Sequence, residues 1–301
     1  MALLSQLRRD LRFNAEFLQL IQTLKNIAAS QYHTLEREKE RFADFMAQFT
    51  GFFQVVDMVH QDAPLVNVMT DVVGIVLVTS DSGFMGGLNA GVIQAGYDVQ
   101  GILPATQIRY IVIGDKGASK LSEGGRDFKA FPGISPETRY EQAMEIRDYI
   151  VKEVSEKRIG KVVVVHPRPI SFTQQTIDTF NLLPCGELFD RASLPASSSA
   201  VPSSAAGKLI ASARKVTVES SFEDMAVYLA EVWVASKLYE VFEDSKLAEF
   251  AARAMHLEDS VQKLEKEHKK LKHQCFRAAH ELVDKSMRES FSSRKKKKKV
   301  A

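Results

Sequence analysis

The residues with the clearest chemical potential lie in one glycine-rich segment, VTSDSGFMGGLNAGV (78–92). This segment follows a continuous apolar run, VVGIVLV (72–78), which is typical of a buried strand. A strand that ends in a glycine-rich turn before a helix can hold a phosphate, because backbone N–H groups and the helix N-terminus favour an anion there. The segment therefore raises the question of nucleotide binding.

The spacing of the glycines argues against a nucleotide loop. A P-loop needs GxxxxGK[ST], and the segment has no lysine after its glycines. Lys208 follows a glycine but precedes a leucine, the GDKG stretch (114–117) also misses the spacing, and GxGxxG does not occur. The pattern favours a structural role, with Gly83 in a tight turn and Gly86 and Gly87 where backbone approaches backbone.

The other reactive side chains form no recognisable catalytic pattern. Neither HExxH nor GxSxG occurs in the chain. Cys185 and Cys275 belong to no CxxC pair and fit two free thiols in a reducing compartment. Neighbouring carboxylates such as Glu36, Glu38 and Glu40 are typical of a solvated helix face. We expect no catalytic residue, no metal ligand and no cofactor.

The composition is that of a globular protein, with 301 residues, 45% hydrophobic and 26% charged. The net charge of +2 depends on the basic run RKKKKK (294–299), so the rest of the chain is acidic. Such a run is typical of a solvated end, and the alternative is a patch for nucleic acid or an anionic membrane. Residues 1–13 lack the apolar core of a signal peptide, and residues 72–78 are far fewer than the ~20 that span a bilayer. We expect a soluble, cytoplasmic protein.

Both ends of the chain carry a heptad pattern. Residues 1–50 and the chain after Gly207 contain neither glycine nor proline, and apolar residues recur there at alternating steps of three and four. The polar exceptions are Asn14, Lys25, Lys39 and His268, and at His268 a polar side chain can fix register or face a partner. Two such helices can bury each other's stripe, which predicts an antiparallel coiled coil; the alternative is two amphipathic helices lying on a core. The two seams are Leu4, Leu7, Leu11, Asn14, Leu18, Ile21, Lys25, Ala28, Tyr32, Leu35, Lys39, Phe42, Met46, Phe49, Phe53 and Val56, and Leu257, Val261, Leu264, His268, Leu271, Cys275, Ala278 and Leu282.

The middle of the chain predicts a small α/β domain. Apolar runs predict buried strands at 72–81, 108–117 and 161–167, the second of them with a turn at GDKG (114–117). Alternation predicts a more exposed strand at 171–184. Helices are predicted at 86–99 and 138–158. The expected fold class is α/β, with an antiparallel coiled coil of long N- and C-terminal helices and a central Rossmann-like α/β domain. The expected segments are an N-terminal helix (1–62), the α/β domain (70–190), a linker (191–207), a C-terminal helix (208–292) and a basic tail (293–301).

Three stretches resemble the gamma subunit of F-type ATP synthases, the central rotor stalk. VTSDSGFMGGLN (78–89) is similar to the family's signature, which usually reads TSDRGLCGGLN; we call residues 79–89 the signature segment. Residues 5–30 follow the family's opening helix, and residues 245–265 resemble its Ala-rich last helix. The resemblance assigns signature and packing roles to Thr79, Ser80, Asp81, Gly83, Gly86, Gly87, Leu88 and Asn89. It places in the rotor shaft Leu18, Ile21, Leu24, Lys25, Ala28, Leu257, Val261, Leu264 and Leu271.

The resemblance implies a non-catalytic subunit of a proton- or sodium-transporting rotary ATP synthase. The implied partners are the alpha and beta subunits of the catalytic hexamer, the epsilon subunit and the membrane c-ring, with no nucleic acid and no membrane span. The implied location is peripheral, on the cytoplasmic face of the inner or plasma membrane. The chain departs from the family at Ser82, where Arg is usual, at Met85, where Cys is frequent, and at its polar, basic end (286–301).

Two other classes of function remain open on the residues alone. A Rossmann-type enzyme with coiled-coil arms predicts a small-molecule pocket. A coiled-coil scaffold or nucleic-acid-binding protein with an α/β domain and a basic tail predicts salt-dependent binding through residues 294–299. Neither class accounts for the signature segment together with both long helices.

Overall fold

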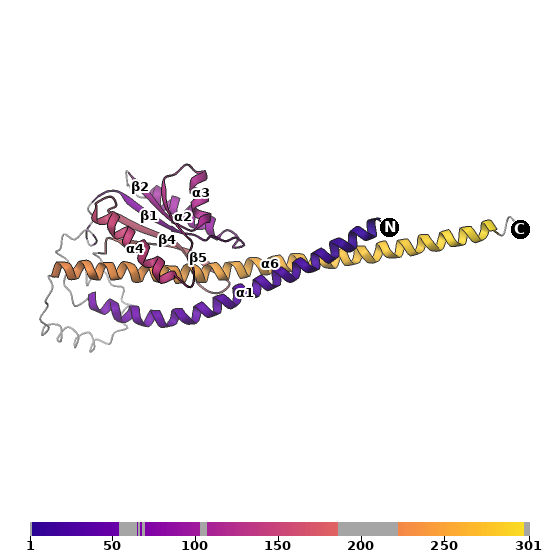
Figure 1. The fold of residues 1–301 in the computed structure, drawn as a ribbon, viewed down its shortest axis with the longest axis horizontal. Coiled ribbons are helices and arrows are strands. Elements are labelled where there is room, and N and C mark those ends of the chain that lie inside the picture. The colour runs from indigo at the N-terminus through magenta and orange to yellow at the C-terminus, as the bar shows by residue number, and fades with distance from the viewer. Residues whose placement is uncertain are drawn as a thin grey trace. The chain divides into compact units, whose positions relative to one another are not determined.

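The computed structural model describes residues 2–53, 65, 67, 70–102, 107–185 and 222–297 (Figure 1). The predicted linker at 191–207 lies outside the described residues, as do residues 298–301 of the predicted tail. In chain order the elements are α1 (Ala2–Phe53), β1 (Val73–Val78), α2 (Leu88–Ile102), β2 (Ile108–Ile113), α3 (Asp115–Glu123), β3 (Phe128–Phe131), α4 (Arg139–Ser155), β4 (Lys161–Pro169), β5 (Gln175–Leu183) and α6 (Phe222–Lys297).

Contacts divide the chain into two compact units. Unit 1 comprises Met1–Ala28 and Ala254–Ala301, and unit 2 comprises Ala29–Arg253. Each unit therefore contains part of α1 and part of α6, and unit 2 also contains the whole sheet.

The sheet of unit 2 has the order β3-β2-β1-β4-β5. Strands β1, β2, β3 and β4 are parallel, and β5 pairs antiparallel with β4. All six residues of β1 are buried, whereas most of β5 is half-exposed, as the continuous and alternating sequence patterns predict. The partly parallel α/β sheet is confirmed.

Two elements of the sheet region were not predicted from the sequence. The GDKG stretch was expected to be a turn, but it opens α3, and the short edge strand β3 follows that helix. Gly114 lies just before the helix and Gly117 within it. Glycine has poor helix propensity, so the tertiary contacts of these two glycines outweigh the local signal.

Helices cover both faces of the sheet, and α6 is one of them (Figure 1). Ile75 and Leu77 of β1 pack with residues of α2 and α3 on one face. Val76 and Val78 point to the other face, where α4 and α6 supply the cover. The buried residues of α6 on that face are Ala230, Val234, Leu238, Val241 and Phe242. This part of α6 belongs to the core of the α/β domain, so here the pattern of an amphipathic helix lying on a core holds.

Unit 1 is an antiparallel pair of helices. Every predicted seam position from Leu4 to Ala28 is buried or half-buried, and nearly all positions between them are exposed. Ile21 of α1 packs with Leu257 and Val261 of α6, and Leu18 and Leu264 lie against them. The coiled coil is therefore confirmed in this unit. The seam positions from Phe42 to Val56 lie outside the residues whose side chains the structure describes.

No helix in the described part of the chain is both long and apolar enough to cross a membrane.

Because α6 completes the core of the α/β domain, shortening one of its buried side chains should destabilise the domain. Phe242 is fully buried, and Phe242→Ala is expected to lower the free energy of unfolding by about 3–5 kcal/mol. Phe276→Ala is the matched control, because Phe276 is 58% exposed, and its effect should stay within ~0.5 kcal/mol. Urea unfolding of the isolated chain measures both, and equal effects would contradict this role of α6.

Candidate functional site

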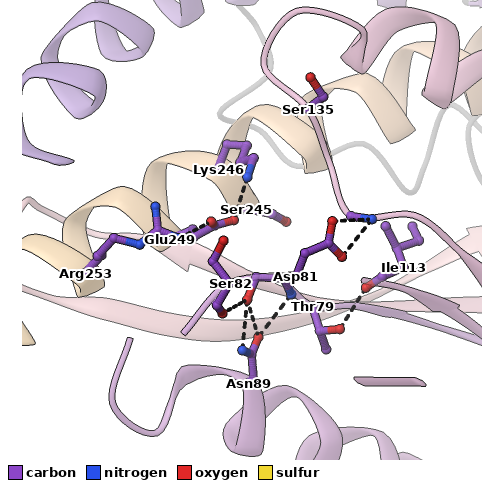
Figure 2. Close-up of polar contacts among 12 residues, drawn as sticks. Thr79, Asp81, Ser82, Asn89, Ile113, Ser135, Ser245, Lys246, Glu249 and Arg253 are labelled. Atoms are coloured by element: carbon purple, nitrogen blue, oxygen red, sulfur yellow. Dashed lines mark hydrogen bonds and ion pairs between the residues drawn. The ribbon is translucent and has the colours of Figure 1, made fainter. Parts of the chain in front are cut away.

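The polar side chains of the signature segment bond to the chain itself. Thr79 Oγ1 donates to the carbonyl of Ile113 (2.8 Å) and accepts from the N–H of Gly117 (3.0 Å). Asn89 Oδ1 accepts from the N–H of Ser80 (3.2 Å), and its Nδ2 donates to Ser80 Oγ (2.9 Å) (Figure 2). These bonds tie the end of β1 to α3 and to the first turn of α2.

Asp81 provides an anion from within the chain. One of its carboxylate oxygens accepts from the N–H of Asp115 (2.9 Å), the first residue of α3, and both accept from the N–H of Gly133 (3.0 and 3.2 Å). A helix N-terminus favours a negative group, and a bound phosphate would use the same kind of donors. The carboxylate of Asp81 therefore takes the position that a nucleotide phosphate would need.

The space beside the signature segment is too small for a nucleotide. The cavity there has a volume of about 10 Å³, roughly the room for one water molecule. Its lining includes Thr79, Ser80 and Asn89, and Ser245 and Glu249 of α6. The segment thus lies beside α6 with no room for a nucleotide between them.

Of the two glycines predicted to approach backbone closely, Gly87 does not do so. A Cβ on Gly83 or Gly87 would meet no atom within 4 Å, so close packing inside the chain does not explain either residue. Gly86 has a φ of 58°, in the left-handed region that glycine adopts most readily. The remaining member of the segment, Leu88, begins α2 and is half-buried.

Close approaches to the segment come instead from glycines at the start of α3 and in the loop before α4. A Cβ on Gly114 or Gly117 would come within 2.5 Å of an atom of Thr79, and one on Gly133 would collide with the carboxylate of Asp81. The sequence gives one indication that Gly114 makes such an approach, because this glycine directly follows an apolar run. Nothing local indicates that Gly133 lies against Asp81.

The two departures from the family signature face different surroundings. Met85 is buried in the cavity wall, and the carbonyl of Ser82 accepts from Ser80 Oγ (3.0 Å). On α6, the buried carboxylate of Glu249 accepts from Lys246 Nζ (2.8 Å) and from Arg253 Nη2 (2.6 Å) (Figure 2). Glu249 is therefore paired with two cations of its own helix.

The hairpin between β4 and β5 adds an aromatic contact to α1 in unit 2. The ring of Phe172 meets Tyr32 edge-on (5.0 Å between centroids) and stacks on His33 (5.9 Å). Tyr32 and Leu35 pack in the same cluster with Leu247 and other α6 residues. The hairpin tip is thus fastened to the paired helices.

Polar residues in the seam of unit 1 have partners on the facing helix. Asn14 Oδ1 lies 3.1 Å from His268 Nδ1, and Lys25 Nζ donates to Glu258 Oε2 (2.9 Å). That bond from Lys25 lowers the pKa of the Glu258 carboxyl. Polar pairs in an apolar seam lose their partners if the helices slip, so they specify one register. The sequence-based expectation for His268 agrees with this geometry.

The predicted shaft residues do not all lie in the seam. Ile21, Ala28, Leu257 and Val261 are buried, and Leu18, Lys25, Leu264 and Leu271 are half-buried. Leu24 faces outward, with 36% of its surface exposed.

Leu24 belongs to a second apolar stripe on α1 that runs beside the seam. Its members also recur at steps of four and three, and the rings of Phe13 and Phe17 stack 6.0 Å apart. Phe13 is 70% exposed and Leu20 is 53% exposed. Sequence reasoning missed this stripe because it followed one seam only. We call it the exposed stripe, and its residues are Phe13, Phe17, Leu20, Leu24 and Ile27.

A larger cavity does not fit a Rossmann-type enzyme. Its volume is about 570 Å³, and it lies where β2 and β3 begin, with Arg109, Lys129 and Tyr149 in its wall. Ligands of open α/β sheets bind at the carboxyl ends of the strands, which is the opposite edge. Arg109 is also already paired with Glu153 (3.2 Å). Across the ranges that the structure describes, no group of three or more His, Cys, Asp or Glu side chains could hold a metal ion.

The geometry defines a class of protein: a coiled-coil stalk with an α/β domain inserted between its two helices. A family model described as ATP synthase matches residues 4–289. The ATP synthase gamma chain of Opitutus terrae is 25% identical over 262 residues, which cover 84% of each chain. That of Desulforudis audaxviator is 24% identical over 189 residues, covering 61% of this chain and 60% of the relative.

Solved structures share the fold. The central stalk and c-ring structure of the Tetrahymena thermophila mitochondrial ATP synthase contains a chain that is 18% identical, with a TM-score of 0.59, and the match covers 80% of this chain and 99% of that one. A chain of the Euglena gracilis mitochondrial ATP synthase rotor is 12% identical, with a TM-score of 0.64, covering 94% and 99%. The chain belongs to the ATP synthase family as a gamma chain, the non-catalytic central-stalk subunit, and the resemblance seen in the sequence is confirmed.

The role of Asp81 as an internal anion can be tested by removing its carboxylate. Asp81→Ala leaves the N–H groups of Asp115 and Gly133 without their acceptor and is expected to cost about 1 kcal/mol of unfolding free energy, as loss of a helix cap does. Asp148→Ala is the control, because the Asp148 side chain is 67% exposed and pairs with the adjacent Arg147. Equal effects in urea unfolding would refute the role.

If the polar seam residues fix the register, removing them should change the yield of a disulfide across the seam without lowering the melting temperature. Leu7→Cys, one heptad from Asn14, is expected to form a disulfide with the native Cys275, one heptad from His268. Adding Asn14→Leu and His268→Leu should keep or raise the melting temperature, because apolar residues replace a buried polar pair, and should lower the disulfide yield. The yield is read on a non-reducing gel, and an unchanged yield would show that the pair does not set the register.

Proposed function

We propose that this chain couples ion flow through a membrane ring to ATP synthesis or hydrolysis at an alpha/beta hexamer, by rotating within that hexamer. The observation that carries the proposal is the exposed stripe, which lies beside a buried seam whose register is fixed by polar pairs. A contiguous apolar surface of this kind is typical of a surface that contacts another protein. The stripe occupies one side of α1, so a partner that surrounds this part would meet a different surface on each side.

Such asymmetry is what a rotor needs in order to act on its neighbours. A partner subunit with two conformations is shifted toward the one that a given face of the shaft stabilises, and it returns when that face turns away. Sliding of α1 against α6 would dissipate the applied torque. The Asn14–His268 and Lys25–Glu258 pairs oppose sliding, and they therefore support torque transmission through unit 1.

The proposed partners follow from the relatives. The similar chain of Tetrahymena thermophila belongs to a central stalk with a c-ring, and another similar chain comes from a Euglena gracilis structure of OSCP, F1 and c-ring. For this chain we propose alpha and beta subunits along the paired helices, and an epsilon subunit and a c-ring at the α/β domain. The complex would lie on the cytoplasmic face of the inner or plasma membrane as a peripheral assembly. The five segments predicted from the sequence remain our working division of the chain.

Purification of the complex from its own cells tests this proposal. We expect native mass spectrometry to give about one copy of the chain per three alpha and three beta subunits. We also expect the recovered complex to hydrolyse ATP. Phe13→Asp with Leu20→Asp should prevent recovery of the active complex, because two charges interrupt the exposed stripe, while the isolated chain keeps its melting temperature. Gln19→Asp, at an exposed polar position of the same helix, is the control. Recovery of the chain alone, or with nucleic acid, would instead favour the scaffold alternative.

A further inference from the structure

We propose that Arg139 is the positioning residue through which torque passes between the α/β domain and the paired helices. The proposal rests on the proposed function, in which the α/β domain is turned by the ring and the helices turn within the hexamer. It concerns unit 2 alone, because Arg139 and all its contacts lie there.

The position of Arg139 is not explained by its own helix. It is the first residue of α4, where the helix dipole disfavours a cation, and the preceding Thr138 makes no side-chain cap. Its side chain reaches both long helices. Nη2 donates to Glu38 Oε2 of α1 (2.7 Å), and Nε donates to the hydroxyl of Tyr239 on α6 (3.1 Å). Arg139 also bonds to the carbonyl of Pro136 in the loop before α4, so the guanidinium is held from three sides.

The same guanidinium also lies close to a second carboxylate, which belongs to α6. The Glu243 side chain is only 1% exposed, and its Oε1 lies 3.8 Å from Arg139 Nη2. Its other oxygen, Oε2, is buried without a hydrogen-bond partner. Burial raises the pKa of Glu243, and the charge of Arg139 opposes that rise. Arg139 is therefore shared between an exposed carboxylate on α1 and a buried one on α6.

Other contacts near Arg139 hold α1 to α6 and hold α4 to α6 without its help. Lys39 forms an ion pair with Asp244, one residue further along both helices, and this pair ties α1 to α6 without the α/β domain. Tyr140 meets the ring of Tyr239 edge-on (6.2 Å between centroids) and provides apolar contact between α4 and α6. Loss of Arg139 would thus leave the two helices joined and the domain in contact with them.

The hydrogen bonds of Arg139 add a directional component to this contact. Apolar packing resists separation of two surfaces but has no preferred direction within the interface. Charge-assisted hydrogen bonds from a planar guanidinium have a fixed geometry, so they resist sliding and turning. Without Arg139 the domain would stay attached but slip under load, which predicts hydrolysis without ion transport.

The test compares hydrolysis with transport in one preparation of the assembled complex, reconstituted in vesicles. Arg139→Gln is expected to lower the ratio of ATP-driven ion uptake to ATP hydrolysis about tenfold, within the range usual for coupling between sites. Arg139→Lys, which keeps the charge but not the fork, should give an intermediate ratio. Arg147→Gln is the control, because Arg147 lies on the same helix and pairs with the exposed Asp148. Its ratio should equal that of the wild type.

The double variant Arg139→Gln with Glu243→Gln separates torque transmission from charge neutralisation. In the double variant no buried carboxylate is left without the neighbouring charge of Arg139. We therefore expect its melting temperature to recover toward that of the wild type, while its ratio of ion uptake to hydrolysis stays low. Recovery of the ratio in the double variant, or a normal ratio in Arg139→Gln alone, would overturn the role of Arg139. A wild-type complex that hydrolyses ATP without ion uptake would overturn the proposed function and this inference with it.

Discussion

The burial of one apolar stripe by another, contributed from opposite ends of the chain, is the constraint on which the structure depends. Neither helix can hide its seam alone, so residues near the start and the end of the chain must meet. In unit 1 they do so through Ile21, Leu257 and Val261. The polar pairs within the seam then choose one register among those that the apolar residues alone would allow. Within unit 2, α6 packs against the sheet of the inserted α/β domain.

The signature segment shows how a phosphate-binding geometry can serve a structural purpose. Its strand, turn and helix have the order of a nucleotide loop, and the receiving helix α3 offers its N-terminus. Asp81 supplies the anion, and Thr79 and Asn89 take up further hydrogen-bonding groups. The result is a rigid junction of three loops beside α6. In a subunit that catalyses nothing, rigidity at that junction is the useful property.

The sequence predicts elements with a periodic apolar pattern but not contacts between residues that lie far apart in the chain. The heptad seam, the buried strands and the exposed β5 follow from local patterns, and each was predicted from the spacing of apolar residues. Asp81 and Gly133 are 52 residues apart, and Arg139 is 101 residues from Glu38, so no local pattern indicates these contacts. The glycines of the segment drew attention by their density, whereas Gly114 and Gly117, which lie in tight contact with Thr79, stand just before α3 and within it. The exposed stripe was readable in principle, since its spacing matches that of the seam.

The contribution of α6 to the core of the α/β domain has a consequence for the order of events during synthesis. Strands β1 to β5 leave the ribosome well before Val234, Leu238 and Phe242 are available to cover their second face. The seam of α1 stays uncovered longer still, until Leu257 and Val261 emerge, which at ordinary elongation rates takes about 12–48 s. Throughout that interval the nascent chain presents two apolar surfaces to its surroundings. We therefore expect its folding to be completed from the C-terminal end, and we expect chaperones that cover those surfaces until translation finishes to raise its yield.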